Sequence, residues 1–171
     1  MGLVSVQSYV AGLLQGLTPP GATGLNAPID AFITPLDPDV NPDGVARVYV
    51  WPASGPEKRI AQPRNNLPAG SIGGWKQTVH DLQVFMVWMD QPDDEGQDVN
   101  FPALIDYVMY ILRTSPNPAL YTDPETGSVS QMVNLGELMT YDFVPPRTLE
   151  GQVWRRYDAR VRCSLWEIFQ A

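Results

Sequence analysis

The stretch Trp75 to Met89, WKQTVHDLQVFMVWM, decides the fold because apolar and polar side chains alternate along it. A period of two residues places successive side chains on opposite faces of a β-strand. The face that we expect to be buried holds His80, Leu82, Val84, Met86 and Trp88, and the opposite face holds Asp81, Gln83 and Phe85. We therefore predict one long strand that extends past the edge of its own core.

The C-terminal stretch Gln152 to Phe169 alternates in the same way and predicts a second long strand. Its apolar face holds Tyr157, Ala159, Val161, Cys163, Leu165 and Phe169. Its other face holds Trp154, Arg156, Asp158, Arg160, Arg162 and Ser164. We expect the apolar face to pack on a core and the basic face to lie in water.

Two shorter segments also read as strands. Val45 to Trp51 is dense in β-branched and aromatic residues and is stopped by Pro52. Gln131 to Val144 alternates with one exception, and the prolines at 145 and 146 close it. Both segments are therefore predicted to be strands of the sheet.

Two amphipathic helices are predicted from apolar stripes with a period of 3.6 residues. The first stripe runs from Val6 to Leu17 and ends at the sequence TPPG, residues 18–21. The second runs from Phe101 to Arg113 and ends at SPNP, residues 115–118. Each helix is expected to bury one broad face.

The remaining long segments are rich in proline and glycine. Between Gly21 and Asn41 at most one short strand fits, at the apolar residues Ala31 to Ile33. No periodicity survives between Pro52 and Gly74, a length that is unusual for a loop inside a compact domain. We expect this second segment to be a protruding arm that contacts a partner.

The order of these elements predicts one α+β domain over residues 1–171. Strands with two interposed helices favour a mostly antiparallel sheet with two helices packed on one face, plus a long extended loop at about 52–74. An apolar content of 44% in 171 residues is enough for one core. No stretch resembles a membrane span or an export signal, so we expect an intracellular product.

The chemistry of the common enzyme classes is poorly represented in this chain. One cysteine, Cys163, and one histidine, His80, cannot build an internal disulfide, a cysteine-based zinc site or the commonest triads. His80 lies on the apolar face of its strand, where a satisfied core or interface histidine is more common than a catalytic one. The phosphate-binding, dinucleotide-binding and nucleophile-elbow motifs do not occur. We therefore predict no enzymatic activity, no cofactor and no metal.

A partial calcium motif occurs at residues 39–44, DVNPDG, which match the opening of an EF-hand loop. Such a loop needs a bidentate carboxylate at its twelfth position, and that position is Val50. The sequence Asn41-Pro42-Asp43-Gly44 fits a type I turn better. We interpret it as the turn that starts the strand at Val45, with a calcium-dependent binding module as the less favoured alternative.

The charges are unevenly distributed along the chain. There are 11 lysines and arginines against 19 acids, a net charge of −8, which disfavours nucleic-acid binding through bulk counterion release. Five arginines are C-terminal, three cations share the arm, and five acids lie between residues 90 and 98. Opposite patches suit self-association through unlike surfaces, although ordinary solvated faces would give the same pattern. A small hydrolase that uses the acidic turn is the least favoured class, because it lacks a histidine partner and an obvious oxyanion-hole motif.

Taken together, the chain resembles the tail terminator proteins of long-tailed, siphovirus-type bacteriophages. The resemblance lies in the order and texture of its elements: the helix VQSYVAGLLQGL, the strand VARVYVW, the arm, the strand HDLQVFMVWM with its acidic turn, the helix FPALIDYVMYILRTSP, and two closing strands that end in RRYDARVRCSLWEIFQA. It implies an α+β subunit of a hexameric ring in the virion neck, assembled in the host cytoplasm. That ring would cap the tail tube, stop tube polymerisation and join the tail to the head-side connector.

The implied partners are further copies of the chain, the tail tube protein and the connector or stopper protein, with genome DNA only passing through the ring lumen. Another neck component, either a head-closure or connector ring or a tail tube subunit, is the alternative. Tryptophans outside a small core are either interface anchors or caps on that core. The interface candidates are Lys58, Arg59, Arg64, Trp75, Asp93, Asp94, Glu95, Trp154, Arg156, Arg160 and Arg162. Among them, we expect Arg156, Arg160 and Arg162 to meet the acidic turn Asp93 to Glu95 of a neighbour or of the tube.

Overall fold

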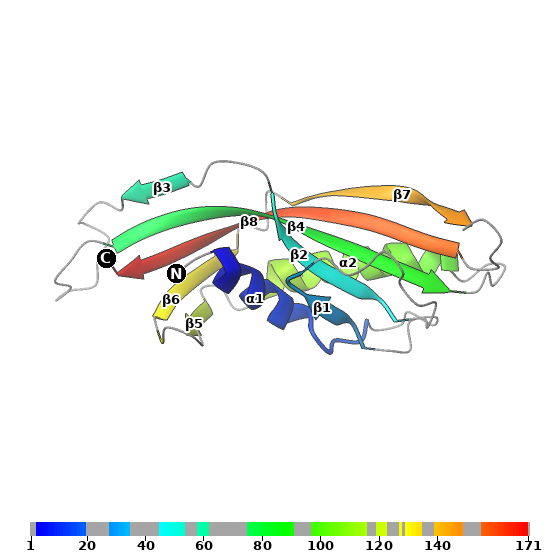
Figure 1. Cartoon of the computed structure of the whole chain (residues 1–171), viewed down its shortest axis with the longest axis horizontal. Helices are drawn as coiled ribbons and strands as arrows, with labels where there is room; N and C mark the ends of the chain where they lie inside the picture. The colour runs from blue at the N-terminus through cyan, green and yellow to red at the C-terminus, as the bar shows by residue number, and fades with distance from the viewer. Residues whose placement is uncertain are drawn as a thin grey trace.

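The centre of the molecule is a ribbon of two antiparallel strands, β4 (Trp75–Asp90) and β8 (Arg155–Gln170), each 16 residues long. Their pairing is continuous, from Trp75 opposite Gln170 to Asp90 opposite Arg155. In the computed structural model this ribbon follows the long axis of the molecule (Figure 1). Both predicted long strands are confirmed. The structure describes residues 3–19, 28–34, 45–53, 58–61, 75–90, 97–115, 119–122, 127, 129–134, 139–148 and 155–170.

Shorter strands flank both edges of the ribbon. The order across the eight-stranded sheet is β1-β2-β4-β8-β6-β5, with β3 also paired to β4 and β7 also paired to β8. Among the described residues, every pairing is antiparallel except that of β1 with β2. The bounds are β1 (Asp30–Phe32), β2 (Arg47–Pro52), β3 (Lys58–Ala61), β5 (Ala119–Thr122), β6 (Val129–Asn134) and β7 (Thr140–Thr148).

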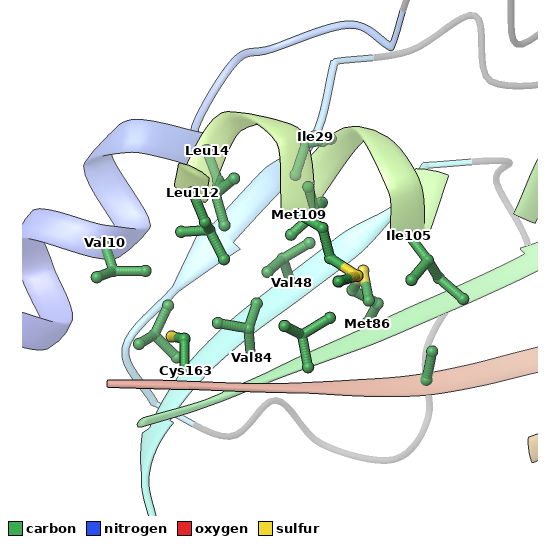
Figure 2. Packing of buried hydrophobic residues seen from close by; sticks show 14 of the residues in the cluster. Val10, Leu14, Ile29, Val48, Val84, Met86, Ile105, Met109, Leu112 and Cys163 are labelled. Atoms are coloured by element: carbon green, nitrogen blue, oxygen red, sulfur yellow. The ribbon is translucent and has the colours of Figure 1, made fainter. Parts of the chain in front are cut away.

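Two helices, α1 (Leu3–Leu14) and α2 (Gln97–Thr114), pack on one face of this sheet (Figure 1). Their apolar stripes and the alternate residues of β2, β4 and β8 form one buried cluster. Figure 2 shows Val10, Leu14, Ile105, Met109 and Leu112 of the helices above Val48, Val84, Met86 and Cys163 of the strands. The molecule is therefore the α+β fold that the sequence predicts, and burial of this cluster is the main favourable term in its stability.

An aromatic cluster fills the core near the start of α2. Trp88 is fully buried and stacks on Phe101 with ring centroids 6.3 Å apart and planes 10° apart. Tyr157 lies 5.3 Å from Trp88 and 5.4 Å from Phe101. Trp88 is thus a core residue rather than an interface anchor, whereas Trp51 at the end of β2 is 42% exposed. The reading as part of the core therefore holds for Trp88, and the reading as an interface anchor stays a prediction for Trp51.

Part of the segment 52–74, which was predicted to be an arm without regular structure, belongs to strands. Pro52 belongs to β2, and Lys58–Ala61 forms β3, which pairs with Lys76–Val79 of β4. The four residues of β3 are too few to show periodicity among the prolines and glycines, so the strand could not be recognised in the sequence. The remainder, 54–57 and 62–74, lies outside the described residues, as do 39–44 of the calcium-like motif.

The predicted strand Gln131 to Val144 is in fact two strands. Strand β6 pairs with the C-terminal part of β8, Leu165 to Ile168, whereas β7 pairs with its N-terminal half, from Arg162 back to Arg155. The prediction that the two prolines close the strand was wrong, because β7 continues to Thr148 with a register shift between Val144 and Arg147. Proline is tolerated there because β7 lies at the edge of the described sheet and the irregularity removes the need for a ladder bond.

Two further differences concern short or terminal elements. The segment after the second helix contains β5, which pairs with β6 and was not predicted. Helix α2 starts at Gln97, four residues before the predicted start at Phe101, so Pro102 lies in its second turn. As far as the described residues go, neither helix is both long enough and apolar enough to cross a membrane.

Candidate interaction surface on the outer face of the sheet

The face of the sheet opposite the helices, here called the outer face, carries both charged and apolar side chains. Strand alternation puts Phe85 and Val87 of β4 on it, together with Tyr49 of β2. The same alternation puts Arg160 of β8 and Asp142 of β7 there. Register places Tyr49 opposite Phe85, Phe85 opposite Arg160, and Arg160 opposite Asp142. One transverse row thus joins four strands that are far apart in the sequence.

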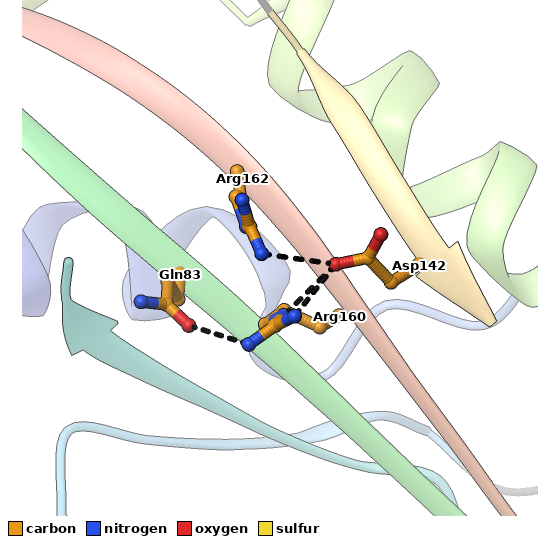
Figure 3. Close-up of polar contacts among 4 residues, drawn as sticks. All are labelled: Gln83, Asp142, Arg160 and Arg162. Atoms are coloured by element: carbon orange, nitrogen blue, oxygen red, sulfur yellow. Dashed lines mark hydrogen bonds and ion pairs between the residues drawn. The ribbon is translucent and has the colours of Figure 1, made fainter. Parts of the chain in front are cut away.

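The strongest polar feature of the outer face is a pair of guanidinium groups on one carboxylate oxygen. Oδ2 of Asp142 accepts hydrogen bonds from Nε and Nη2 of Arg160, at 3.2 and 2.7 Å, and from Nη2 of Arg162, at 3.2 Å (Figure 3). Nη1 of Arg160 also donates to Oε1 of Gln83 at 3.5 Å. The Arg160 hydrogen bonds hold the pKa of the Asp142 carboxyl below its usual value. The carboxylate is therefore ionised at neutral pH.

The charge balance of this group is uneven. Two guanidinium groups share one carboxylate, which leaves a local net charge of +1 within a chain whose total is −8. The side chains of Arg162 and Asp142 are 53% and 55% exposed, so solvent screens their attraction and the pair contributes little to stability. Within the described part of the chain, Arg162 donates only to Asp142. Most of its five N–H donors are therefore available to a partner.

Arg156 differs from the other two arginines of this face. Its Nε donates to both oxygens of Asp158, at 2.9 and 3.0 Å, and its Nη2 lies 2.8 Å from Oδ1. Both side chains are largely buried, at 17% and 20% exposure. Burial also raises the pKa of the neighbouring Tyr49 hydroxyl, although the charge of Arg156 opposes the shift. Arg156 thus fixes the position of Asp158 within the subunit, and its guanidinium is poorly accessible to a second molecule.

A groove of about 370 Å³ runs beside these charges. Its lining includes the apolar side chains of Tyr49, Phe85 and Val87, and charged groups of Asp142 and Arg160. The Tyr49 and Phe85 rings lie 6.5 Å apart with planes tilted by 41°, and Tyr49 packs against the buried cluster of Val87 and Met89. An apolar floor with a charged rim is the usual composition of a protein–protein interface.

The structure brings together only some of the predicted interface residues. Arg156, Arg160 and Arg162 share the outer face, as predicted. Lys58 pairs with Val79 of β4, and Val79 lies opposite Trp166 of β8. Trp166 is six residues from Arg160 along β8, which is about 20 Å at about 3.3 Å per residue. Lys58 is therefore far from the arginines of the outer face. Arg59 and Trp75 lie at that same end of the ribbon. Arg64, Asp93, Asp94, Glu95 and Trp154 are outside the described residues.

Three contributors to the surface were not among the predicted residues. Phe85 was placed on the polar face of its strand, and Asp142 could have been placed there because it alternates with Tyr141 and Phe143 in the predicted strand 131–144. Tyr49 could have been placed there by the same reasoning. Alternation does not reveal which strands are neighbours, and for this reason the sequence did not show that Asp142, Phe85 and Tyr49 lie in one row with Arg160.

The opposite face holds a buried polar pair that is not part of this surface. Nε2 of His80 lies 2.9 Å from Oε2 of Glu167, which confirms the interpretation of His80 as a satisfied core histidine. Oγ1 of Thr78 and Oε1 of Glu167 are buried and have no hydrogen-bond partner in the part of the chain that the structure describes. No group of three or more potential metal ligands occurs among the described residues.

Comparison with known proteins adds no further assignment. No protein-family model matches the chain, and no curated protein is significantly similar to it.

Proposed function

We propose that this chain is a structural virion protein that assembles into a ring at the end of a phage tail tube, in the role of a tail terminator. The observation that carries the proposal is the outer face of the sheet. It combines an apolar groove with an excess of cationic groups, on a chain that is otherwise strongly acidic. Such a surface is suited to contact with protein.

The charge distribution supports contact through unlike surfaces. A ring of identical subunits joins two different patches of each subunit, and a positive patch on an acidic chain can meet a negative patch of the next copy. Identical patches of a two-fold dimer would instead bring Arg162 close to its symmetry mate. Heterologous contact therefore fits this surface better than a two-fold dimer does.

The shape of the subunit gives further support. The ribbon of β4 and β8 is 16 residues long, about 50 Å at about 3.3 Å per residue, and the helices cover one of its faces. Exposed apolar side chains lie toward opposite ends of this ribbon, with Leu120 of β5 near one end and Val144 of β7, which pairs with Asp158, toward the other. Separated apolar edges of this kind are available for contacts with two different neighbours.

The experiment that tests the proposal is negative-stain electron microscopy of the purified protein, alone and mixed with tail tubes. Rings that sit on tube ends and block further polymerisation are the expected result. Long tubes formed by the protein alone would instead identify a tube subunit. Rings that bind connectors but never tube ends would identify a head-side neck component.

A further inference from the structure

We propose that a carboxylate of a second copy of this chain binds the exposed guanidinium of Arg162. Asp142 of the same subunit competes with that carboxylate for Arg162. The inference rests on the proposed ring, because it names one contact within it. In the free subunit, Asp142 accepts hydrogen bonds from both arginines. In the assembled form, the carboxylate of the second copy accepts hydrogen bonds from the remaining N–H donors of Arg162.

The hydrogen-bond geometry supports unequal roles for the two arginines. Arg160 makes two bonds to Asp142, one of them 2.7 Å long, and a third to Gln83, so its orientation is set within the subunit. Arg162 makes a single bond of 3.2 Å and is more exposed than Arg160, at 53% against 35% of the side chain. Arg162 can therefore turn toward a partner at small cost, while Arg160 keeps Asp142 in place.

Charge complementarity identifies the occupant as another copy. The arginine pair exceeds its carboxylate by one charge, and the chain carries 19 acidic residues against 11 basic ones. A second copy thus offers more carboxylates than cationic groups as partners for this site. Ionised Asp142 repels the approaching carboxylate, so its charge weakens the contact between copies.

The groove next to the arginines supports a protein partner over a free anion. Phe85 and Tyr49 form an apolar floor beside Arg160, and a partner that covers this floor removes the ion pair from water. Exclusion of water strengthens charge-assisted hydrogen bonds at the centre of an interface. The site is therefore suited to a carboxylate carried on a folded surface.

The test compares D142N with D106N in sedimentation equilibrium, alone and with tail tubes, at low and moderate salt. Both substitutions change the net charge from −8 to −7, but Asp106 is exposed on α2, on the opposite side of the sheet. The amide oxygen that D142N introduces can still accept the Arg160 hydrogen bonds, so the orientation of the arginines is kept. We expect D142N to associate several-fold more tightly than wild type, D106N to match wild type within about twofold, and R162Q to associate at least several-fold more weakly.

Association of D142N that is no tighter than that of D106N would overturn the competitor role, and so would normal association of R162Q. Circular dichroism of each variant checks that it is folded. Failure of the proposed function looks different in the same samples. If copies associate through Arg162 but never cap a tube, the terminator role alone is refuted. If the protein caps tubes equally well with each of the three substitutions, this inference alone is refuted.

Discussion

Nε2 of His80 lies 2.9 Å from Oε2 of Glu167, and both residues are buried on the helix-bearing face of the ribbon. They come from neighbouring strands: His80 pairs with Leu165 and Thr78 pairs with Glu167. The second oxygen of Glu167 accepts no hydrogen bond from any residue that the structure describes. This carboxyl therefore depends on His80 for its only hydrogen bond among the described residues.

Removing the histidine should be more damaging than neutralising the acid. H80A leaves the Glu167 carboxyl buried and unpaired, and we expect a loss of about 3–5 kcal/mol in the free energy of unfolding. E167Q keeps a side-chain carbonyl that can accept from His80, and we expect a loss of about 1–2 kcal/mol. Urea denaturation measures both values. A smaller loss for H80A than for E167Q would contradict this account of the pair.

The two tryptophans at opposite extremes of exposure should behave differently. W88A removes a fully buried ring from the cluster with Phe101 and Tyr157, and we expect a loss of about 3–5 kcal/mol in stability. W51A removes a ring that is 42% exposed, and its effect should be within about 1 kcal/mol. Urea denaturation of both variants tests the assignment. Equal losses would show that Trp51 belongs to the core as much as Trp88 does.

The Cys163 thiol should be unreactive in the folded protein. It is 4% exposed, and burial, with a smaller contribution from the charge of Asp81, raises its pKa to about 12. Because the thiolate is the reactive species, we expect no rapid labelling by a disulfide reagent at pH 8 and complete labelling in urea. Rapid labelling of the native protein would mean that this part of the core opens readily.

The same thiol should make stability depend on pH under alkaline conditions. The unfolded thiol has an ordinary pKa of 9.0, and the folded value is about 12, so the unfolded chain loses its proton first. The contribution is fully present below about pH 9 and is lost as the pH rises toward about 12, at up to about 1.4 kcal/mol per unit. Urea denaturation of wild type and C163A from pH 8 to 10.5 tests this, because only wild type should show this component. A stability difference that does not change with pH would contradict it.

The sequence-based hypothesis about the acidic turn can be tested by reciprocal charge reversal. One variant combines R160E with R162E, and the other combines D93K, D94K and E95K. If these groups meet between copies, each variant alone should fail to assemble, and an equimolar mixture should assemble again. Electron microscopy of the three samples is the measurement. Arg156 is left unchanged because Asp158 already holds it with bonds of 2.9 and 3.0 Å. A mixture that stays unassembled would exclude this pairing of surfaces.

Much of the fold could be predicted because period and composition are local properties. The alternation of Trp75 to Met89 identified both the strand and its buried face, and Leu82, Val84 and Met86 are indeed fully buried. The short strands β3 and β5 could not be predicted, because four residues do not establish a period. They are strands because a neighbour supplies hydrogen-bond partners, and that information is not local.

The candidate surface could also be predicted only in part. The basic character of one face of β8 follows from the spacing of Arg156, Arg160 and Arg162 alone. That spacing did not indicate that Asp158 satisfies the first arginine or that Asp142 bridges the other two. Those partners depend on strand order and register.

By itself, the sequence determined the number and faces of the long elements, the overall α+β class and the acidic total charge. These properties depend on residues a few positions apart, which interact through local geometry. Only the tertiary structure decided that Trp88 is core and Trp51 is surface, and that β7 lies beside the arginines of β8. Asp142 reaches Arg160 across 18 positions of the chain because antiparallel pairing sets their strands side by side, and no local pattern encodes that pairing.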